Sequence, residues 1–119
     1  MSRVLPVTAE TFQSEVLDSA IPVLVDLYAT WCAPCRMMAP VLDRLAVELE
    51  GQIKIVKIDT DEQPELAEAF RVSSIPMLAL IKDGEVVDGS VGLVSPEQIR
   101  QMLKKVMPPA PVPAQAASR

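Results

Sequence analysis

The chain has 119 residues, half of them apolar and 23% charged, a balance that predicts one globular domain around a largely aliphatic core. Its 11 basic and 16 acidic side chains give a net charge of -5, which disfavours nucleic acids and anionic membrane surfaces as partners. The absence of His excludes the usual general base at neutral pH and every His-containing metal site.

The first elements alternate between strand and helix patterns. A β-rich segment at residues 4–7 carries Pro6, which suits an edge strand, and Thr8 is then the predicted N-cap of a helix. The apolar residues of this helix recur at helical spacing: Phe12, Val16 and Leu17. Residues 23–29 are apolar on both faces apart from Asp26, which predicts a strand covered by helices on both sides.

A long amphipathic helix is predicted after Cys32, ending near Gly51 in a left-handed conformation. Its apolar face consists of residues at helical spacing: Met38, Val41, Leu42, Leu45 and Leu49. Pro40 lies inside this helix and predicts a kink. A β-branched strand follows at residues 53–58, and a short helix follows at residues 64–70.

The last third of the chain changes pattern. Strands at residues 77–81 and 86–91 flank Asp-Gly at residues 83–84, which predicts an antiparallel hairpin. Residues 95–98, Ser-Pro-Glu-Gln, combine an N-cap, a first-turn Pro and a capping-box Gln. The buried face of the helix that follows is predicted to contain Ile99, Met102, Leu103 and Val106. Together, these elements predict an α/β fold with a mixed sheet between two helical layers.

Residues 108–119 are rich in Pro and Ala and predict a disordered tail after a domain that spans residues 1–107. The longest apolar run, residues 75–81, falls far short of the roughly 20 residues that a membrane-spanning helix needs. The first ten residues lack the pattern of an export signal. We therefore expect a soluble, cytoplasmic protein without membrane contact.

Both cysteines lie in one short segment, residues 31–36, which reads Trp-Cys-Ala-Pro-Cys-Arg. Residues three apart share a helix face, so the sulfurs of Cys32 and Cys35 are predicted to lie close enough for a disulfide. At the start of a helix, unpaired N–H groups and the helix dipole stabilise a thiolate at Cys32. Pro34 suits this first turn, and Arg36 adds positive charge. This segment predicts a redox-active dithiol.

Three other roles for the cysteines are possible. Two Cys without His cannot supply the four ligands of a structural zinc or iron-sulfur site within one chain, so we expect no metal. A purely structural disulfide would close a very small loop and add little stability, and cytosolic thiols are kept reduced. Two unrelated buried cysteines remain an alternative that the strand-to-helix context disfavours.

The motif resembles the W-C-G-P-C-K site of the thioredoxin family, and the likeness runs through residues 3–107. Matching segments stand in the right order at residues 25–26, 57–59, 74–76, 83–84 and 91–92. The resemblance implies the thioredoxin fold, with a central five-stranded mixed β-sheet flanked by four α-helices. It also implies a protein-disulfide reductase without a cofactor of its own, recycled by a thioredoxin reductase and contributing to cell redox homeostasis.

The resemblance further implies that Cys32 is the exposed nucleophile and that Cys35 is the resolving thiol, which we expect to be more buried and less acidic. It implies that Asp26 is buried beneath the cysteines, where desolvation raises the pKa of a carboxyl group and lets it relay a proton from Cys35. The alternative is that Asp26 bonds nearby backbone. Lys57 is implied to neighbour Asp26 on the adjacent strand, and an exposed strand Lys is its alternative.

The resemblance implies a cis peptide bond before Pro76, which leaves the backbone of Ile75 free to pair with an extended substrate. An apolar surface that docks disulfide-containing partner proteins is implied at Trp31, Ala33, Pro34, Ile75, Pro76, Val91 and Gly92. For Val91, a place in the core is the alternative.

Three residues depart from the family pattern. Tyr28 stands where the family usually has Trp, Ala33 replaces Gly, and Met77 stands where a small polar residue is common. Ala33 bears on the redox potential and Met77 on substrate fit. Two rival functions stay open: a disulfide oxidase or isomerase, and a thioredoxin-fold binding subunit. We expect a monomer.

Overall fold

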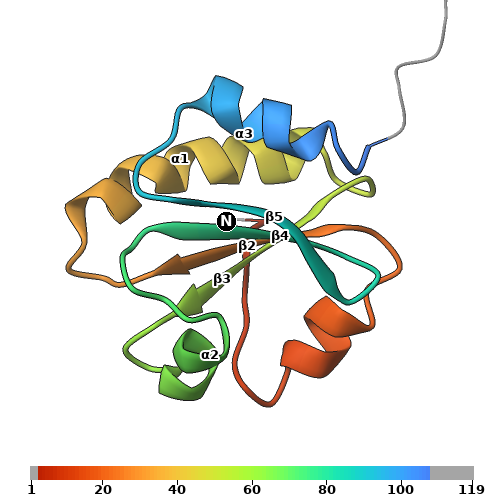
Figure 1. Ribbon diagram of the computed structural model, residues 1–119. Coiled ribbons are helices and arrows are strands. Elements are labelled where there is room, and N and C mark those ends of the chain that lie inside the picture. Colours follow the sequence, from red (N-terminus) through yellow and green to blue (C-terminus); the bar gives the residue numbers. More distant parts are fainter. Residues whose placement is uncertain (1–2, 108–119) are drawn as a thin grey trace, which may run out of the picture.

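The computed structural model describes residues 3–107, which form a five-stranded sheet with helices on both faces (Figure 1). The strands are β1 (Leu5–Pro6), β2 (Val23–Tyr28), β3 (Lys54–Asp59), β4 (Met77–Lys82) and β5 (Glu85–Val91). Their spatial order is β1-β3-β2-β4-β5, with β1 and β2 parallel to β3 and with β4 antiparallel to β2 and β5. The predicted change from crossover connections to a hairpin is confirmed.

Within the described residues, the helices are η1 (Gln13–Leu17), α1 (Ala33–Glu48), α2 (Pro64–Ala69) and α3 (Pro96–Leu103). Helices α1 and α3 cover one face of the sheet, while η1 and α2 lie on the other (Figure 1). The predicted mixed sheet between two helical layers is therefore confirmed (Figure 1). Outside η1 the element bounds differ from the predicted ones by a few residues, and α3 ends at Leu103, so Val106 lies beyond the helix that was predicted to contain it.

Strand β2 runs through the middle of the sheet, and its alternate side chains enter two cores. Leu24 packs in a cluster with buried residues of α1 and α3. Val25 and Leu27 pack in a second cluster, to which residues of η1 and α2 contribute. Asp26 lies two positions after Leu24, so it points to the α1 side, where it is the one buried charged side chain of residues 3–107. The strand is apolar on both faces because both faces are covered.

The turn and capping signals act as the sequence predicts. Asp83 and Gly84 have φ angles of 53° and 78°, the left-handed conformation that a tight hairpin turn needs at both positions. At the start of α3, the Ser95 side chain accepts a hydrogen bond from the Gln98 N–H at 3.1 Å. In return, the Gln98 side chain accepts one from the Ser95 N–H at 2.8 Å. Gly51, just beyond α1, has a φ of 85°.

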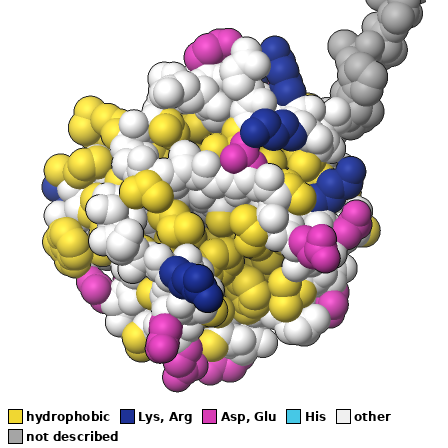
Figure 2. All heavy atoms as spheres, viewed as in Figure 1, with side chains coloured by type: hydrophobic (Ala, Val, Ile, Leu, Met, Phe, Trp, Pro, Cys, Tyr) yellow, Lys and Arg dark blue, Asp and Glu magenta, His cyan; other side chains and the backbone are white. Residues whose placement is uncertain are grey.

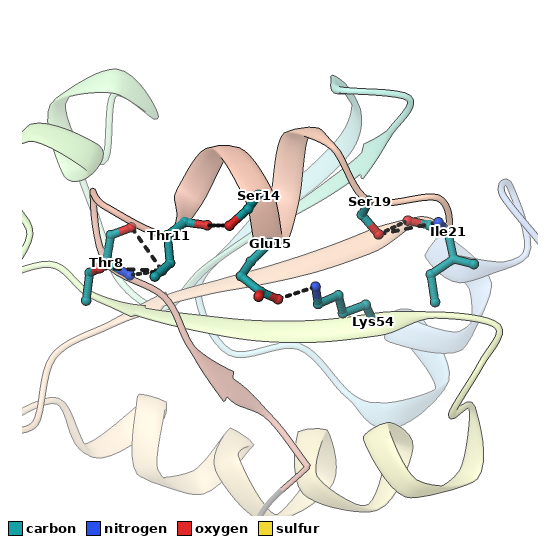
Figure 3. A network of polar contacts seen from close by, with 7 residues as sticks. All are labelled: Thr8, Thr11, Ser14, Glu15, Ser19, Ile21 and Lys54. Atoms are coloured by element: carbon teal, nitrogen blue, oxygen red, sulfur yellow. Dashed lines mark hydrogen bonds and ion pairs between the residues drawn. The ribbon is translucent and has the colours of Figure 1, made fainter.

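The helix expected after Thr8 is present, but its predicted start is wrong. Thr8 forms a turn with Thr11, whose hydroxyl accepts a hydrogen bond from the Thr8 N–H at 3.0 Å (Figure 3). Because this turn occupies Thr8, η1 begins only at Gln13, has no side-chain cap and is wound as a π-helix. An ion pair of 2.5 Å between Glu15 and Lys54 joins η1 to β3.

Other sequence predictions have different outcomes. Helix α1 continues through Pro40, and the kink stays a prediction. The tail predicted at residues 108–119 lies outside the described residues. None of the helices within residues 3–107 is both long enough and apolar enough to cross a bilayer.

Candidate active site

The two cysteines lie where β2 gives way to α1. Cys32 is the N-cap of α1, in extended backbone conformation, and its N–H donates to the Ala29 carbonyl at 3.2 Å. Cys35 lies one turn into the helix, its Cα 5.2 Å from that of Cys32, and the two side chains form a disulfide. The Cys35 N–H donates to the Cys32 Sγ at 3.3 Å. One of the unpaired N–H groups of the first turn therefore points at the Cys32 sulfur, which favours a thiolate there after reduction.

The expected difference in exposure between the two cysteines is wrong for this disulfide form. Cys32 and Cys35 are each only 4% exposed. The Cys32 side chain folds back over the first turn of α1, and the two cysteines form a small apolar cluster with Ala29. Ile75 and Tyr28 pack against this cluster. Cys32 is therefore distinguished from Cys35 by its place at the helix N-terminus, not by its exposure.

Asp26 is 6% exposed and lines the same pocket, of about 360 Å³, as Cys35 and Lys57. Burial raises the pKa of its carboxyl group from the ordinary 3.8 to about 7, although the positive charge of Lys57 acts in the opposite direction. The Asp26 Oδ1 is buried and has no hydrogen-bond partner within residues 3–107. The alternative role for Asp26, bonding nearby backbone, is not seen at this oxygen. A carboxyl group in this state can hold or release a proton near neutral pH.

Lys57 lies beside Asp26 in the sheet, where the two residues are register partners on β3 and β2. The Lys57 Nζ is placed over the ring of Tyr28, 5.8 Å from the ring centroid. The ion pairs found among residues 3–107 do not include one between Lys57 and Asp26. Lys57 therefore acts on Asp26 through its charge at a distance rather than through direct contact.

A segment of free backbone lies beside the disulfide. The Ile75–Pro76 peptide bond is cis, as the resemblance implies. Within the described chain, neither the N–H nor the C=O of Ile75 has a hydrogen-bond partner. The Pro76 carbonyl accepts a hydrogen bond from the Gly92 N–H at 2.7 Å, and Gly92 has a φ of 91°, which favours glycine. The loops at residues 75–76 and 91–92 are thereby held side by side.

The apolar surface implied by the resemblance is only partly exposed. Trp31 is 68% exposed and Val91 58%, so the alternative of Val91 in the core is wrong. Ala33 and Pro34 are also exposed, Ile75 and Gly92 are half-buried, and Pro76 is buried. Leu93, which is 51% exposed, was missed, although it directly follows Gly92. Figure 2 shows apolar side chains gathered at the end of the molecule where α1 begins.

The orientation of Trp31 depends on a residue that no pattern in the sequence singles out. The Trp31 Nε1 donates to the Asp61 Oδ2 at 2.8 Å, and the Asp61 N–H donates in turn to the Asp59 Oδ1 at 2.9 Å. The turn after β3 thus carries the acceptor that fixes the exposed indole ring. Only the folded chain brings these two segments together.

We predict that Asp61→Ala frees the Trp31 ring and weakens substrate docking. Loss of one exposed hydrogen bond costs about 1 kcal/mol or less, so KM should rise up to about fivefold while kcat stays unchanged. Steady-state kinetics and Trp31 fluorescence anisotropy measure the two effects. Glu62→Ala removes a neighbouring negative charge without touching the indole and is the matched control. An equal rise in KM for both variants would show that charge, not ring orientation, matters.

The chemistry available to this arrangement is narrow. Residues 3–107 contain no group of three or more side chains suited to a metal ion. They do contain a reversible dithiol at a helix N-terminus, a buried carboxyl group in the same pocket, and free backbone beside the sulfurs. Together, these features define a thiol-disulfide oxidoreductase.

Comparisons with known proteins agree with this class. The thioredoxin family model matches residues 3–105. Thioredoxin 1 of a Nostoc species is 50% identical over 105 residues, which cover 88% of this chain and 98% of the relative. Thioredoxin 1 of Synechococcus elongatus is 49% identical, and the thioredoxin of Haemophilus influenzae 45% identical, with the same coverage. The chain belongs to the thioredoxin family, has the thioredoxin fold and functions as a thiol-disulfide oxidoreductase.

Proposed function

We propose that this protein reduces disulfides in other proteins, with Cys32 as nucleophile and Cys35 as resolving thiol. The Cys32 thiolate attacks one sulfur of the substrate disulfide, forming a mixed disulfide and releasing the other substrate sulfur as a thiolate. The Cys35 thiolate then attacks the Cys32 sulfur and releases the second substrate thiol. The substrate gains two electrons and two protons, and the protein is left with the Cys32–Cys35 disulfide. The place of Cys32 at the helix N-terminus carries this assignment.

The second step needs Cys35 to lose a proton, and we assign Asp26 as the group that receives it. Asp26 and Cys35 line one pocket, and the carboxyl pKa of about 7 lets Asp26 accept a proton and pass it on near neutral pH. The buried Oδ1 without a hydrogen-bond partner is free to do so. Lys57 moderates the charge of Asp26 from the neighbouring strand.

An extended substrate segment would pair with the unpartnered backbone of Ile75, which lies against the cysteine cluster. Pairing along this edge would place a substrate disulfide beside Cys32, and side chains near that disulfide would contact the exposed Trp31 and Val91. Ala33, Pro34, Pro76 and Gly92 complete the docking region. The substrates are therefore proteins whose disulfide lies in an accessible, extended segment.

Members of the thioredoxin family are themselves reduced by thioredoxin reductase, and we extend this partner to the present chain. We further propose that the protein works in the cytoplasm as a monomer and contributes to redox homeostasis and electron transport. These assignments rest on the family to which the chain belongs.

The reduction potential of the Cys32–Cys35 pair tests the direction of transfer. The protein is equilibrated with a dithiol buffer, and the fluorescence of Trp31, the only tryptophan, reports the fraction of protein that is reduced. This fraction gives the reduction potential. We expect a potential of about -270 mV, as in a reductant, whereas about -180 to -120 mV would indicate an isomerase or oxidase. The oxidase or isomerase remains the second candidate function because Ala33 replaces the family's Gly between the cysteines, where the residue affects the reduction potential. Partner activity that survives Cys→Ser replacement at both positions would indicate a binding subunit instead.

A further inference from the structure

The ammonium group of Lys57 has two possible partners in the pocket beside Cys35. One is Asp26, its register partner on β2, whose Cα lies about 5 Å away in a sheet of ordinary spacing. The other is Tyr28, two residues further along β2 and therefore on the same face as Asp26. The Lys57 Nζ lies over the Tyr28 ring, 5.8 Å from its centroid.

This placement is unexpected on electrostatic grounds. The four-carbon stem of Lys57 is long enough to reach the adjacent strand, and a buried carboxylate attracts an ammonium group more strongly than a ring face does. The Asp26 Oδ1 nevertheless has no hydrogen-bond partner in the described structure. Asp26 therefore leaves this contact open, and the Lys57 ammonium group lies over the Tyr28 ring instead.

We propose that Tyr28 is a positioning residue, whose ring holds the Lys57 ammonium group out of direct contact with the Asp26 carboxyl group. This inference takes its functional meaning from the proton relay proposed above for Asp26. A direct Lys57–Asp26 ion pair would stabilise the carboxylate and weaken its ability to take a proton from Cys35. With Lys57 held by the ring, Asp26 experiences the positive charge at a distance and stays close to its titration midpoint near neutral pH.

The other groups around the pocket do not account for this arrangement. Helix α1 contributes Cys35 and Arg36, and the Arg36 guanidinium is turned away to donate to the Thr30 carbonyl at 2.8 Å. Strand β4 places only the apolar Leu78 opposite Asp26. Burial raises the pKa of the Tyr28 hydroxyl, and the negative charges of Asp59, Glu62 and Asp26 act in the same direction. The phenol thus stays neutral, and its ring face is what attracts Lys57.

The test is the titration of the Asp26 carboxyl carbon by 13C NMR in the oxidised, full-length protein, where the cysteines do not titrate. Tyr28→Leu removes the ring, and we expect the Asp26 midpoint to fall by about one pH unit as Lys57 moves onto the carboxylate. Tyr28→Phe keeps the ring and should leave the midpoint unchanged. Asp26→Asn assigns the resonance.

A Lys57→Met background separates the proposed effect from simple hydration of the pocket. If Tyr28 acts through Lys57, Tyr28→Leu should not lower the midpoint once Lys57 is gone. An equal fall with and without Lys57 would overturn the proposal, because opening the pocket to water would then explain it. No change in Tyr28→Leu, or a similar fall in Tyr28→Phe, would overturn it as well.

The rate of insulin reduction as a function of pH distinguishes this inference from the relay itself. If Asp26 relays the proton, the pH dependence of the rate in Tyr28→Leu should move to lower pH together with the carboxyl titration. A titration that moves as expected while the rate profile stays in place would support the positioning by Tyr28 and contradict the relay by Asp26. Unfolding curves for both Tyr28 variants confirm that the comparison is made on folded protein.

Discussion

Replacement of Cys35 by Ser is expected to turn the protein into a covalent trap for its substrates. Cys32 keeps its place at the N-terminus of α1, so its thiolate still attacks a substrate disulfide. Without a thiol one turn deeper, the mixed disulfide cannot be resolved. Each molecule should therefore release one substrate thiol and then stop, with catalytic turnover at background. Mass spectrometry under non-reducing conditions measures the adduct, and a thiol reagent measures the released group.

The matched variant is Cys32→Ser, which removes the nucleophile and leaves a single thiol deeper in the helix. We expect this variant to form no adduct and to release no substrate thiol above background. The adduct of the trapping variant should disappear on treatment with excess dithiol. Stable adducts from Cys32→Ser, together with normal turnover of Cys35→Ser, would reverse the roles assigned to the two sulfurs.

The features that the sequence predicted well are those set by neighbours in the chain. The hairpin at residues 83–84 needs two residues with positive φ, and the cap at residues 95–98 is completed within one helical turn. The contact between Cys32 and Cys35 likewise follows from their spacing on one helix. In each case, the side chains that decide the structure lie within four residues of one another, so a local pattern is enough.

The features that the sequence did not predict depend on segments far apart in the chain. The Trp31 ring donates a hydrogen bond to Asp61, which lies on the turn after β3. The ammonium group of Lys57 on β3 lies over the ring of Tyr28 on β2. The equal burial of the two cysteines depends on packing by Ile75, which precedes β4. Single-sequence reasoning can list the groups that need a partner but not the partner that the fold supplies. The predicted start of η1 was wrong for a local reason, because Thr8 takes part in a turn with Thr11 instead of capping the helix.

Met77, one of the departures from the family pattern, has a structural role that the sequence did not indicate. Met77 was expected to bear on substrate fit because it follows Pro76 in sequence. Its side chain is half-buried and packs against the core cluster that includes Val25 and Leu27. Met77 thus fills space on the η1 and α2 side of the sheet, so we expect its substitution to alter stability more than substrate choice.

Asp26→Asn is expected to stabilise the protein by about 4 kcal/mol above pH 7, since the pKa rises from 3.8 to about 7 at about 1.4 kcal/mol per pH unit. The sign follows from the direction of this change. Between pH 4 and pH 7, the Asp26 carboxyl group is protonated in the folded protein but has lost its proton in the unfolded chain. The wild type therefore loses stability as the pH rises through this window. The Asn variant has no such loss. Urea unfolding at a series of pH values measures the difference, which should vanish below about pH 4.

Asp88→Asn is the control of opposite sign. The Asp88 Oδ2 accepts a hydrogen bond from the Lys105 Nζ at 2.6 Å, which lowers the pKa of this exposed carboxyl group. Its replacement should therefore leave stability unchanged in acid and reduce it at neutral pH. Equal stability of Asp26→Asn and wild type at every pH would contradict a raised pKa at Asp26. If the variant is more stable and also slower in exchange near neutral pH, the buried carboxyl group is retained for its chemistry at the expense of stability.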